Sequence, residues 1–371
     1  MFKSNYETRQ ILGGVLIAGT VILGSGCATA SPATDAESLL QDILTEDGGP
    51  GVMAAVIRDG ELIWSGQAGL ADMEAGVPMT ADTLMRIGSV SKPFTAVLAL
   101  RLAELGRMDL DADIRGLLPE LVEPERGMIT PRMIGAHTSG IRHYDFSNIL
   151  EANNFFFHQS LTDGNAAFFD NALVSVPGAE HHYTSIGFNF LGIAAERAAE
   201  TDFATALVTY VTGPLRLENT MIDHALAIIP NRTRFYTRFP DGVTRNTYWR
   251  DSSDFYPSGG ILSTARDLAN LTAATFDGEW LSTASMELLH TEGTTTSGEG
   301  VDYSFGWQIQ HDDEGKVDWF GHGGETNGAY AVVRYYPEHN LAVAGIMNAN
   351  FAMGEPVFFD TITDDLADLF K

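Results

Sequence analysis

Alternating apolar runs separated by turn residues predict that both ends of the chain form sheet. The segment 52–69, VMAAVIRDGELIWSGQAG, has apolar runs on either side of Asp59-Gly60, a pair that tolerates positive φ and therefore predicts a hairpin. Further on, AYAVVRYY and LAVAGIMNA flank residues 337–340 and predict a second hairpin. An amphipathic stretch from Val357 to Phe370 predicts a final helix.

The middle of the chain has the pattern of helices and loops. A helix is predicted from Thr95 to Leu105, closed by Gly106 as its C-cap, and another from Asn189 to Glu200. Sheet at both ends around a helical middle predicts an α/β (α+β) fold with an inserted lobe. We expect residues 33–88 and 258–371 to form the α/β lobe and residues 89–257 the mainly helical lobe.

The first thirty residues have the pattern of a secretory signal peptide. Lys3 and Arg9 precede an apolar run, Ile11–Leu23, which is too short and wrongly flanked for a stable membrane span. Residues 28–30, Ala-Thr-Ala, fit a small-residue cleavage site. Alternatively, Cys27 is the lipidated cysteine of a bacterial lipoprotein, although Gly24 stands where leucine is usual. Both alternatives predict export, to the periplasm or the medium, with a membrane anchor only in the second.

Composition narrows the classes of function. Of the 371 residues, 44% are hydrophobic and 19% charged, which are globular values and exclude a disordered chain. The formal net charge of −27 repels nucleic acid and anionic membranes. Cys27 is the only cysteine, so the fold has no internal disulfide and must depend on its hydrophobic core.

The stretch GSVSKPFT, residues 88–95, contains a lysine where the chain otherwise prefers arginine. There are four lysines against eighteen arginines, and Lys92 is three residues after Ser89. Pro93 is tolerated only near a helix start, so the helix that runs to Leu105 should begin close to Ser89, with both side chains on one face. A serine needs a neighbour to take its proton, and a buried lysine, unlike arginine, can become neutral. Ser-x-x-Lys alone is nevertheless a weak signal that chance could produce.

Two further stretches make the set specific. PGAEHHYTSIGFNFLG, residues 177–192, contains Tyr183-x-Ser185, and FGHGGETNGAY, residues 320–330, contains His322-x-Gly324. In this order the motifs resemble the serine β-lactamase and penicillin-recognising family, in its class C, DD-peptidase and esterase branch. The resemblance covers about residues 36–350. Supporting stretches are LMRIGSVSKPFTA (84–96), GRMDLDADI (106–114), GAHTSGI (135–141), PSGGILSTARDLANL (257–271) and FGWQI (305–309).

The resemblance implies a β-lactamase/transpeptidase-like fold: an antiparallel sheet flanked by helices, with the active site in a cleft beside a mainly helical lobe. It implies that Ser89 is acylated, that Lys92 and Tyr183 move protons, and that residues 322–324 form one wall of the cleft. The oxyanion hole would be the backbone N–H groups of Ser89 and Glu325. Whether Lys92 and Tyr183 form an ammonium–phenolate pair or are both neutral stays open.

Three departures from the family pattern bear on the substrate. Ser185 stands where asparagine is common, Gly323 where threonine is common, and His322 where class C β-lactamases have lysine. The charge of a histidine fades near neutral pH, so we expect weaker, pH-dependent attraction of carboxylates. These changes favour a hydrolase of esters or peptide-like amides. The alternatives are a class C-like β-lactamase, an acyltransferase with the same site, and a non-catalytic cell-wall or penicillin-binding homologue.

Other residues have plainer interpretations. His158, His181 and His182 lack the spacing of a metal motif, so no metal and no cofactor is expected. NNFFFHQS, residues 153–160, is either an apolar lip of the cleft or core. Trp307 is expected in the sheet packing and His137 in a structural loop. The chain has no G-x-S-x-G, which excludes the nucleophile elbow of α/β-hydrolases.

Overall fold

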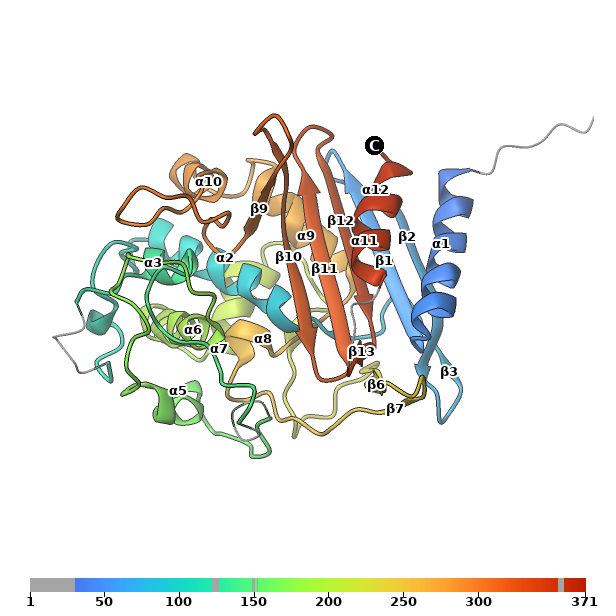
Figure 1. The fold of residues 1–371 in the computed structure, drawn as a ribbon, viewed down its shortest axis with the longest axis horizontal. Helices are drawn as coiled ribbons and strands as arrows, with labels where there is room; N and C mark the ends of the chain where they lie inside the picture. Colours follow the sequence, from blue (N-terminus) through green and yellow to red (C-terminus); the bar gives the residue numbers. More distant parts are fainter. Residues whose placement is uncertain (1–30, 122–126, 149–150, 152, 353–356) are drawn as a thin grey trace, which may run out of the picture. The chain divides into compact units, whose positions relative to one another are not determined.

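The two ends of the chain pair in one seven-stranded antiparallel sheet (Figure 1). The strand order is β3-β2-β1-β12-β11-β10-β9, so the first strands lie directly beside the last. The strands are β1 (Gly51–Arg58), β2 (Glu61–Asp72), β3 (Val77–Pro78), β9 (Gln308–His311), β10 (Val317–Thr326), β11 (Ala329–Tyr336) and β12 (Leu341–Met347).

Both predicted hairpins are present. Asp59 and Gly60, at φ 51° and 76°, make the tight turn between β1 and β2. Asn340, at φ 45°, ends the turn between β11 and β12. A two-residue turn with positive φ matches the right-handed twist of its strands, which is why the local sequence alone specifies the β1–β2 hairpin.

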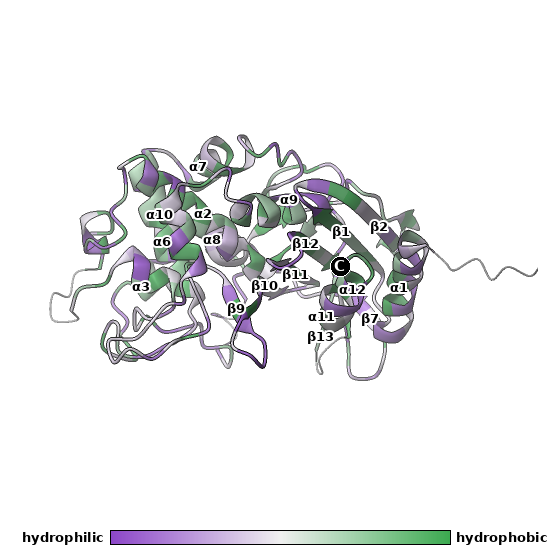
Figure 2. Ribbon diagram, turned by 90° about the horizontal axis from the view of Figure 1, so that it is seen from above, coloured by the Kyte–Doolittle hydropathy of each residue, from purple (hydrophilic) through white to green (hydrophobic). Residues whose placement is uncertain are grey.

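Strand β1 is buried along nearly its whole length because both faces of the sheet are covered. Val52, Ala54 and Val56 pack in a cluster with α1 (Pro32–Asp47) and the C-terminal helical segment, while the alternate residues pack in the larger core that includes α9 (Ala265–Phe276). Figure 2 shows these helices on opposite faces of the sheet. Since side chains of a strand alternate between faces, one apolar run serves both cores.

The predicted C-terminal helix is confirmed, with an unexpected interruption. It consists of α11 (Phe358–Asp360), a π-helical stretch at Thr361–Asp365 and α12 (Leu366–Asp368). Its apolar side chains Phe358, Ile362 and Leu366 are fully buried on the sheet.

Helices and loops form the middle of the chain, as predicted. The first of these helices begins at Ser91, before the apolar run from Thr95 and close to Ser89 as Pro93 predicted. The helix expected from Asn189 begins earlier, at Ser185, capped by the Thr184 hydroxyl. The helices are α2 (Ser91–Glu104), α3 (Pro131–Gly135), α5 (Leu161–Gly164), α6 (Ser185–Ala199), α7 (Phe203–Leu207), α8 (Tyr256–Gly259) and α10 (Thr283–His290).

Two small sheets tie the middle of the chain to the large sheet. One has the order β4-β8-β5, from β4 (Met85–Arg86), β5 (Met221–Ile222) and β8 (Ile261–Ser263). The other has the order β13-β6-β7, from β6 (Tyr236–Arg238), β7 (Thr244–Asn246) and β13 (Ala349–Phe351). Strand β4 ends three residues before Ser89 and so anchors the start of the site.

The computed structural model describes residues 31–121, 127–148, 151, 153–352 and 357–371. Within them, Pro32–Lys371 form one compact unit, and the division into two lobes stays a prediction. The predicted signal peptide and Cys27 lie outside the described residues. In the described part, none of the helices combines the length and apolar character that crossing a bilayer requires.

Candidate active site

Ser89 lies in a 3₁₀ turn, Gly88–Val90, that leads directly into α2. Gly88 has φ +49°, and a Cβ there would lie 2.7 Å from the Glu325 carbonyl oxygen. Only glycine therefore allows this turn to approach β10 so closely. The hydroxyl of Ser89 lies near the N-terminus of a fourteen-residue helix, whose dipole favours negative charge there.

Lys92 is completely buried and meets three oxygen atoms. Its Nζ lies 2.9 Å from Ser89 Oγ, 3.0 Å from Ser185 Oγ and 3.0 Å from the Ser258 carbonyl oxygen. Ser185 begins α6 and Ser258 lies in α8, so three separate helical elements converge on one amine.

Burial lowers the pKa of Lys92 well below its usual range of about 10.5. A neutral amine has two N–H donors and one lone pair. The donors suit the Ser258 carbonyl and Ser185 Oγ, which leaves the lone pair to accept the Ser89 O–H. An ammonium could donate to the same three oxygen atoms, so it is the burial that lowers the pKa, and not the contacts, that favours the neutral form.

Tyr183 is partly buried beside the same pair. Burial raises its pKa above the usual value, while a side-chain hydrogen bond with Ser89 acts in the opposite direction. Lys92 Nζ lies 4.8 Å from the centre of the Tyr183 ring. With the pKa of the amine lowered and that of the phenol raised, the arrangement favours the pair in which both groups are neutral.

Strand β10 closes the other side of Ser89. A Cβ at Gly324 would lie 2.2 Å from the Ile87 carbonyl oxygen and 3.0 Å from the Ser89 nitrogen. The backbone of β10 therefore runs against the Ser89 turn, and Glu325 follows immediately. This places the two predicted oxyanion donors, the amides of Ser89 and Glu325, on adjoining segments.

His322 is buried, and its ring does not carry the charge that was expected to titrate near neutral pH. Its Nε2 lies 2.9 Å from the Tyr303 hydroxyl, and its Nδ1 contacts the Gly323 carbonyl, so a neutral ring with Nδ1–H satisfies both partners. Burial, with the nearby Lys92, lowers the pKa of His322 to about 3. The expectation that this charge fades around neutral pH is wrong, because the ring is already neutral there.

We therefore expect no titration of His322 between about pH 5 and 8, where a histidine of ordinary pKa titrates. Histidine-selective ¹⁵N labelling and NMR, with His322→Asn to assign the signal, measure this directly. Protonation would begin only as the pH falls toward about 3. A signal that titrates near neutral pH and is absent from His322→Asn would contradict the neutral ring.

The cleft at Ser89 is small, with a volume of about 120 Å³. Its walls include residues that the sequence motifs do not single out. They are His143, Tyr144, Phe146, Arg250, Phe255, Gly259, Thr326 and Asn327, besides Ser89, Ser185, Ser258 and Glu325. Gly259, Thr326 and Asn327 lie within stretches that carry the family resemblance, whereas the other five come from loops that no motif covers. Burial and the nearby Lys92 lower the pKa of His143 to about 4, so it too is neutral at pH 7.

The structure also places the other residues that the sequence analysis considered. Trp307 is fully buried in the core, and His137 is buried with its Nδ1 accepting the Thr184 amide, as expected. The phenylalanines of 153–160 are not core, since Phe156 is 71% exposed, and they do not line the cleft. Among the described residues, no group of three His, Cys, Asp or Glu is placed to hold a metal ion.

This fold, with a Ser-x-x-Lys helix start facing a glycine-containing strand, is that of serine hydrolases related to the β-lactamases. A family model described as Beta-lactamase matches residues 36–359. The chain therefore belongs to the β-lactamase family, and the resemblance seen in its motifs is confirmed.

Named relatives span several activities. The mitochondrial serine β-lactamase-like protein LACTB of Homo sapiens is 27% identical over 296 residues, 62% of this chain and 54% of that protein. Esterase EstB of Burkholderia gladioli is 32% identical over 206 residues, 51% of each chain. The chain thus spans about half the length of these two relatives. A β-lactamase of Yersinia enterocolitica is 24% identical over 357 residues, 86% of this chain and 87% of that protein.

Solved structures agree on the fold. A class C β-lactamase superposes with a TM-score of 0.74 at 18% identity, covering 92% of this chain and 96% of that one. A penicillin-binding protein homologue from Pyrococcus abyssi gives a TM-score of 0.77 at 23% identity, covering 90% and 76%. At such identities the likeness establishes the fold alone, which is the β-lactamase/transpeptidase-like fold that the motifs implied.

Proposed function

We propose that this chain hydrolyses esters or peptide-like amides through an acyl-enzyme on Ser89. The observation that carries the proposal is the contact of 2.9 Å between Lys92 Nζ and Ser89 Oγ, made by a lysine with no exposed surface. A lysine held neutral in this way is a base, whereas a surface lysine is not.

In the acylation step, Ser89 Oγ attacks the carbonyl carbon of the substrate and its proton passes to Lys92 Nζ. The oxyanion that forms is stabilised by the amides of Ser89 and Glu325. Tyr183 donates its phenolic proton to the leaving group and recovers a proton from Lys92. The C–O or C–N bond breaks, and the acyl group stays on Ser89.

In the deacylation step, water enters the cleft and gives a proton to the same pair of groups as its oxygen attacks the ester of Ser89. The bond between the acyl carbon and Ser89 Oγ then breaks, and the proton taken from water passes to Oγ. The products are a carboxylic acid and the regenerated hydroxyl. Lys92 keeps its two structural contacts, Ser185 Oγ and the Ser258 carbonyl, through both steps, which holds the amine in reach of Oγ.

The charges of the cleft favour a substrate without a carboxylate. Glu325 is exposed and lines the cleft, whereas His322 and Gly323 are not among its described lining residues, and His322 is neutral at pH 7. Arg250 also lines the cleft, but its guanidinium lies 3.3 Å from Asp254 and stacks on Phe255. An uncharged ester or amide is therefore a better fit than a β-lactam or a D-Ala-D-Ala terminus, both of which carry a carboxylate.

The test of this proposal is covalent labelling with a fluorophosphonate, followed by peptide mass spectrometry. We expect one adduct, on Ser89, and none in Ser89→Ala. Ser147→Ala is the matched control, because Ser147 is an exposed loop serine outside the cleft, and it should label like wild type. Equal labelling of Ser89→Ala, or an adduct on another serine, would refute the proposal.

The small cleft predicts a preference for short acyl chains. With about 120 Å³ available, p-nitrophenyl acetate or butyrate should be hydrolysed faster than the decanoate. Phe146 lines the cleft and is 67% exposed, so Phe146→Ala should shift the preference toward longer chains. Phe156→Ala, which removes an equally exposed ring away from the cleft, should leave the profile unchanged. kcat/KM across the ester series is the measurement, and a profile that ignores chain length would contradict the assignment.

We also propose that the protein acts outside the cytoplasm. The support is the basic, apolar and small-residue order of residues 1–30. Expression in a Gram-negative host, fractionation and intact-mass analysis test this. Loss of the first residues, with or without a lipid on Cys27, is expected, and an unprocessed cytoplasmic chain would contradict it.

A further inference from the structure

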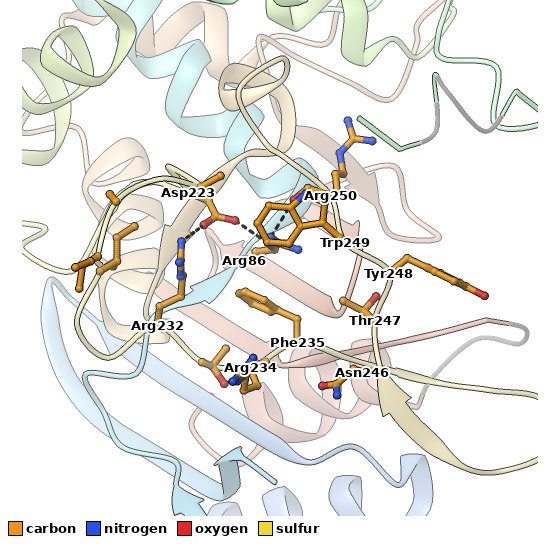
Figure 3. A pocket seen from close by; sticks show the side chains of 15 residues that line it. Arg86, Asp223, Arg232, Arg234, Phe235, Asn246, Thr247, Tyr248, Trp249 and Arg250 are labelled. Atoms are coloured by element: carbon orange, nitrogen blue, oxygen red, sulfur yellow. Dashed lines mark hydrogen bonds and ion pairs between the residues drawn. The ribbon is translucent and has the colours of Figure 1, made fainter. Parts of the chain in front are cut away.

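A second cavity, of about 520 Å³, lies beside the cleft and shares Arg250 with it (Figure 3). Residues 223–235 and 246–250 supply most of its walls, and Arg86 of β4 completes them. The volume falls in the range of small-molecule sites, whereas the Ser89 cleft is much smaller.

The cavity reverses the charge of the molecule locally. Among its described lining residues are four arginines and one carboxylate, in a chain of net charge −27. Asp223 is shared: its Oδ2 lies 2.7 Å from Arg86 Nε and its Oδ1 lies 3.0 Å from Arg232 Nη1. Figure 3 shows this chain of ion pairs. One carboxylate thus faces two guanidinium groups, which leaves one positive charge in excess.

Two of the arginines are placed to meet an anion. The hydrogen bonds described for Arg232 both use Nη1, a guanidinium has five N–H donors, and the side chain is 27% exposed. Arg234 is 62% exposed, and its Asp72 partner is 3.6 Å away. Planar guanidinium groups in such positions suit a carboxylate, which they can bind through two parallel hydrogen bonds.

Apolar and aromatic side chains form most of the remaining lining, together with the polar Thr233, Asn246 and Thr247. The ring of Phe235 lies 4.2 Å from the Arg86 guanidinium carbon. Trp249 is 59% exposed and Ile228 is 98% exposed, although both are large apolar side chains. Exposed apolar surface of this kind next to a charged pocket marks a site for a ligand that is itself apolar at one end.

We propose that this cavity binds a small carboxylate that carries an aromatic or other apolar group. The carboxylate would lie at Arg232 and Arg234, and the apolar group against Phe235 and Trp249. This site needs no chemistry at Ser89, so it stands or falls separately from the hydrolase proposal.

The test is isothermal titration calorimetry of the full chain with 4-phenylbutyrate, in the Ser89→Ala background so that no reaction at Ser89 is needed. We expect 4-phenylbutyrate to bind. The neutral 4-phenylbutyramide should bind about tenfold more weakly, because the charge-assisted hydrogen bonds are lost. Arg232→Gln should weaken binding of the acid about tenfold, and the more exposed Arg234→Gln about threefold. Arg86 is left intact in this test, since it also holds the Asn327 carbonyl beside the cleft.

Arg245→Gln is the matched control. Arg245 is a nearby surface arginine, paired with Asp241 and absent from the cavity lining, so its loss removes the same charge without touching the site. The proposal is overturned if 4-phenylbutyrate does not bind at up to about 10 mM, if acid and amide bind equally, or if Arg245→Gln weakens binding as much as Arg234→Gln. The exposed position of Arg234 keeps the test decisive even if Arg232→Gln does not fold.

Discussion

Lys92→Met is expected to lower kcat/KM for a short-chain ester on the order of 10⁴-fold, while the chain still folds. Methionine has a similar length and no charge, so it fills the buried space but cannot take the Ser89 proton. Lys92→Arg should lose as much, because a guanidinium stays protonated and cannot act as the base. Steady-state kinetics give the rates, and thermal denaturation shows whether each variant is folded.

Lys316→Met is the control for the first substitution. Lys316 is exposed and pairs with Glu338 on the surface, so its loss should change neither activity nor folding appreciably. If Lys92→Met kept more than about a tenth of the wild-type kcat/KM, Lys92 would not be the base on which the proposed acylation depends.

The same assignment fixes the sign of the pH dependence. Burial lowers the pKa of Lys92, so the neutral amine is present above that lowered pKa and is lost as the pH falls through it. We expect kcat/KM for a neutral ester to fall on the acid side. At neutral pH, which is well below the pKa of an exposed lysine, kcat/KM should still be at its full value. A rate that rises only near pH 10 would show that Lys92 is not neutral in the folded protein.

Gly324→Ala is expected to lower kcat by about 10² to 10³-fold, the usual cost of a damaged oxyanion hole. The added Cβ would lie 2.2 Å from the Ile87 carbonyl oxygen and 2.9 Å from the Val90 nitrogen, which are backbone atoms that cannot move aside alone. The strand and the Ser89 turn must separate, and the amides of Ser89 and Glu325 separate with them. KM should change much less than kcat, because the oxyanion exists only after attack.

Gly323→Ala provides the matched comparison on the neighbouring residue of the same strand. A Cβ at Gly323 would meet only the Phe359 ring, at 3.7 Å, which is an ordinary contact. Its kcat should stay near wild type. Equal losses in the two variants would mean that the approach of β10 to the Ser89 turn does not control the rate.

Some features follow from residues that are close in the sequence. Both hairpins depend on two to four turn residues with their flanking apolar runs, and the structure contains both. The reach from Ser89 to Lys92 is likewise local, because residues three apart share a helix face. Pro93 placed the start of α2 close to Ser89, but α6 begins four residues earlier than its apolar pattern predicts. That pattern marks only the regular part of a helix and misses a first turn whose side chains face a site.

The ordered motifs are enough to identify the family from the amino-acid sequence alone. Each motif is short, but its residue types are those a serine acyl-enzyme needs, and few other constraints would retain all of them in that order. The roles of Ser89, Lys92 and Tyr183 nevertheless stay predictions that the kinetic and labelling experiments test.

By itself, then, the sequence determined the hairpins, the local Ser89–Lys92 pairing and the family. Only the tertiary structure showed the burial that shifts the pKa values of the site. Lys92 meets the Ser258 carbonyl from 166 residues away, and His322 meets Tyr303 across a buried contact. It alone revealed the arginine-lined cavity as well. The physical reason is that pKa values and cavities depend on burial, and burial comes from segments that are distant along the chain and meet only when it folds.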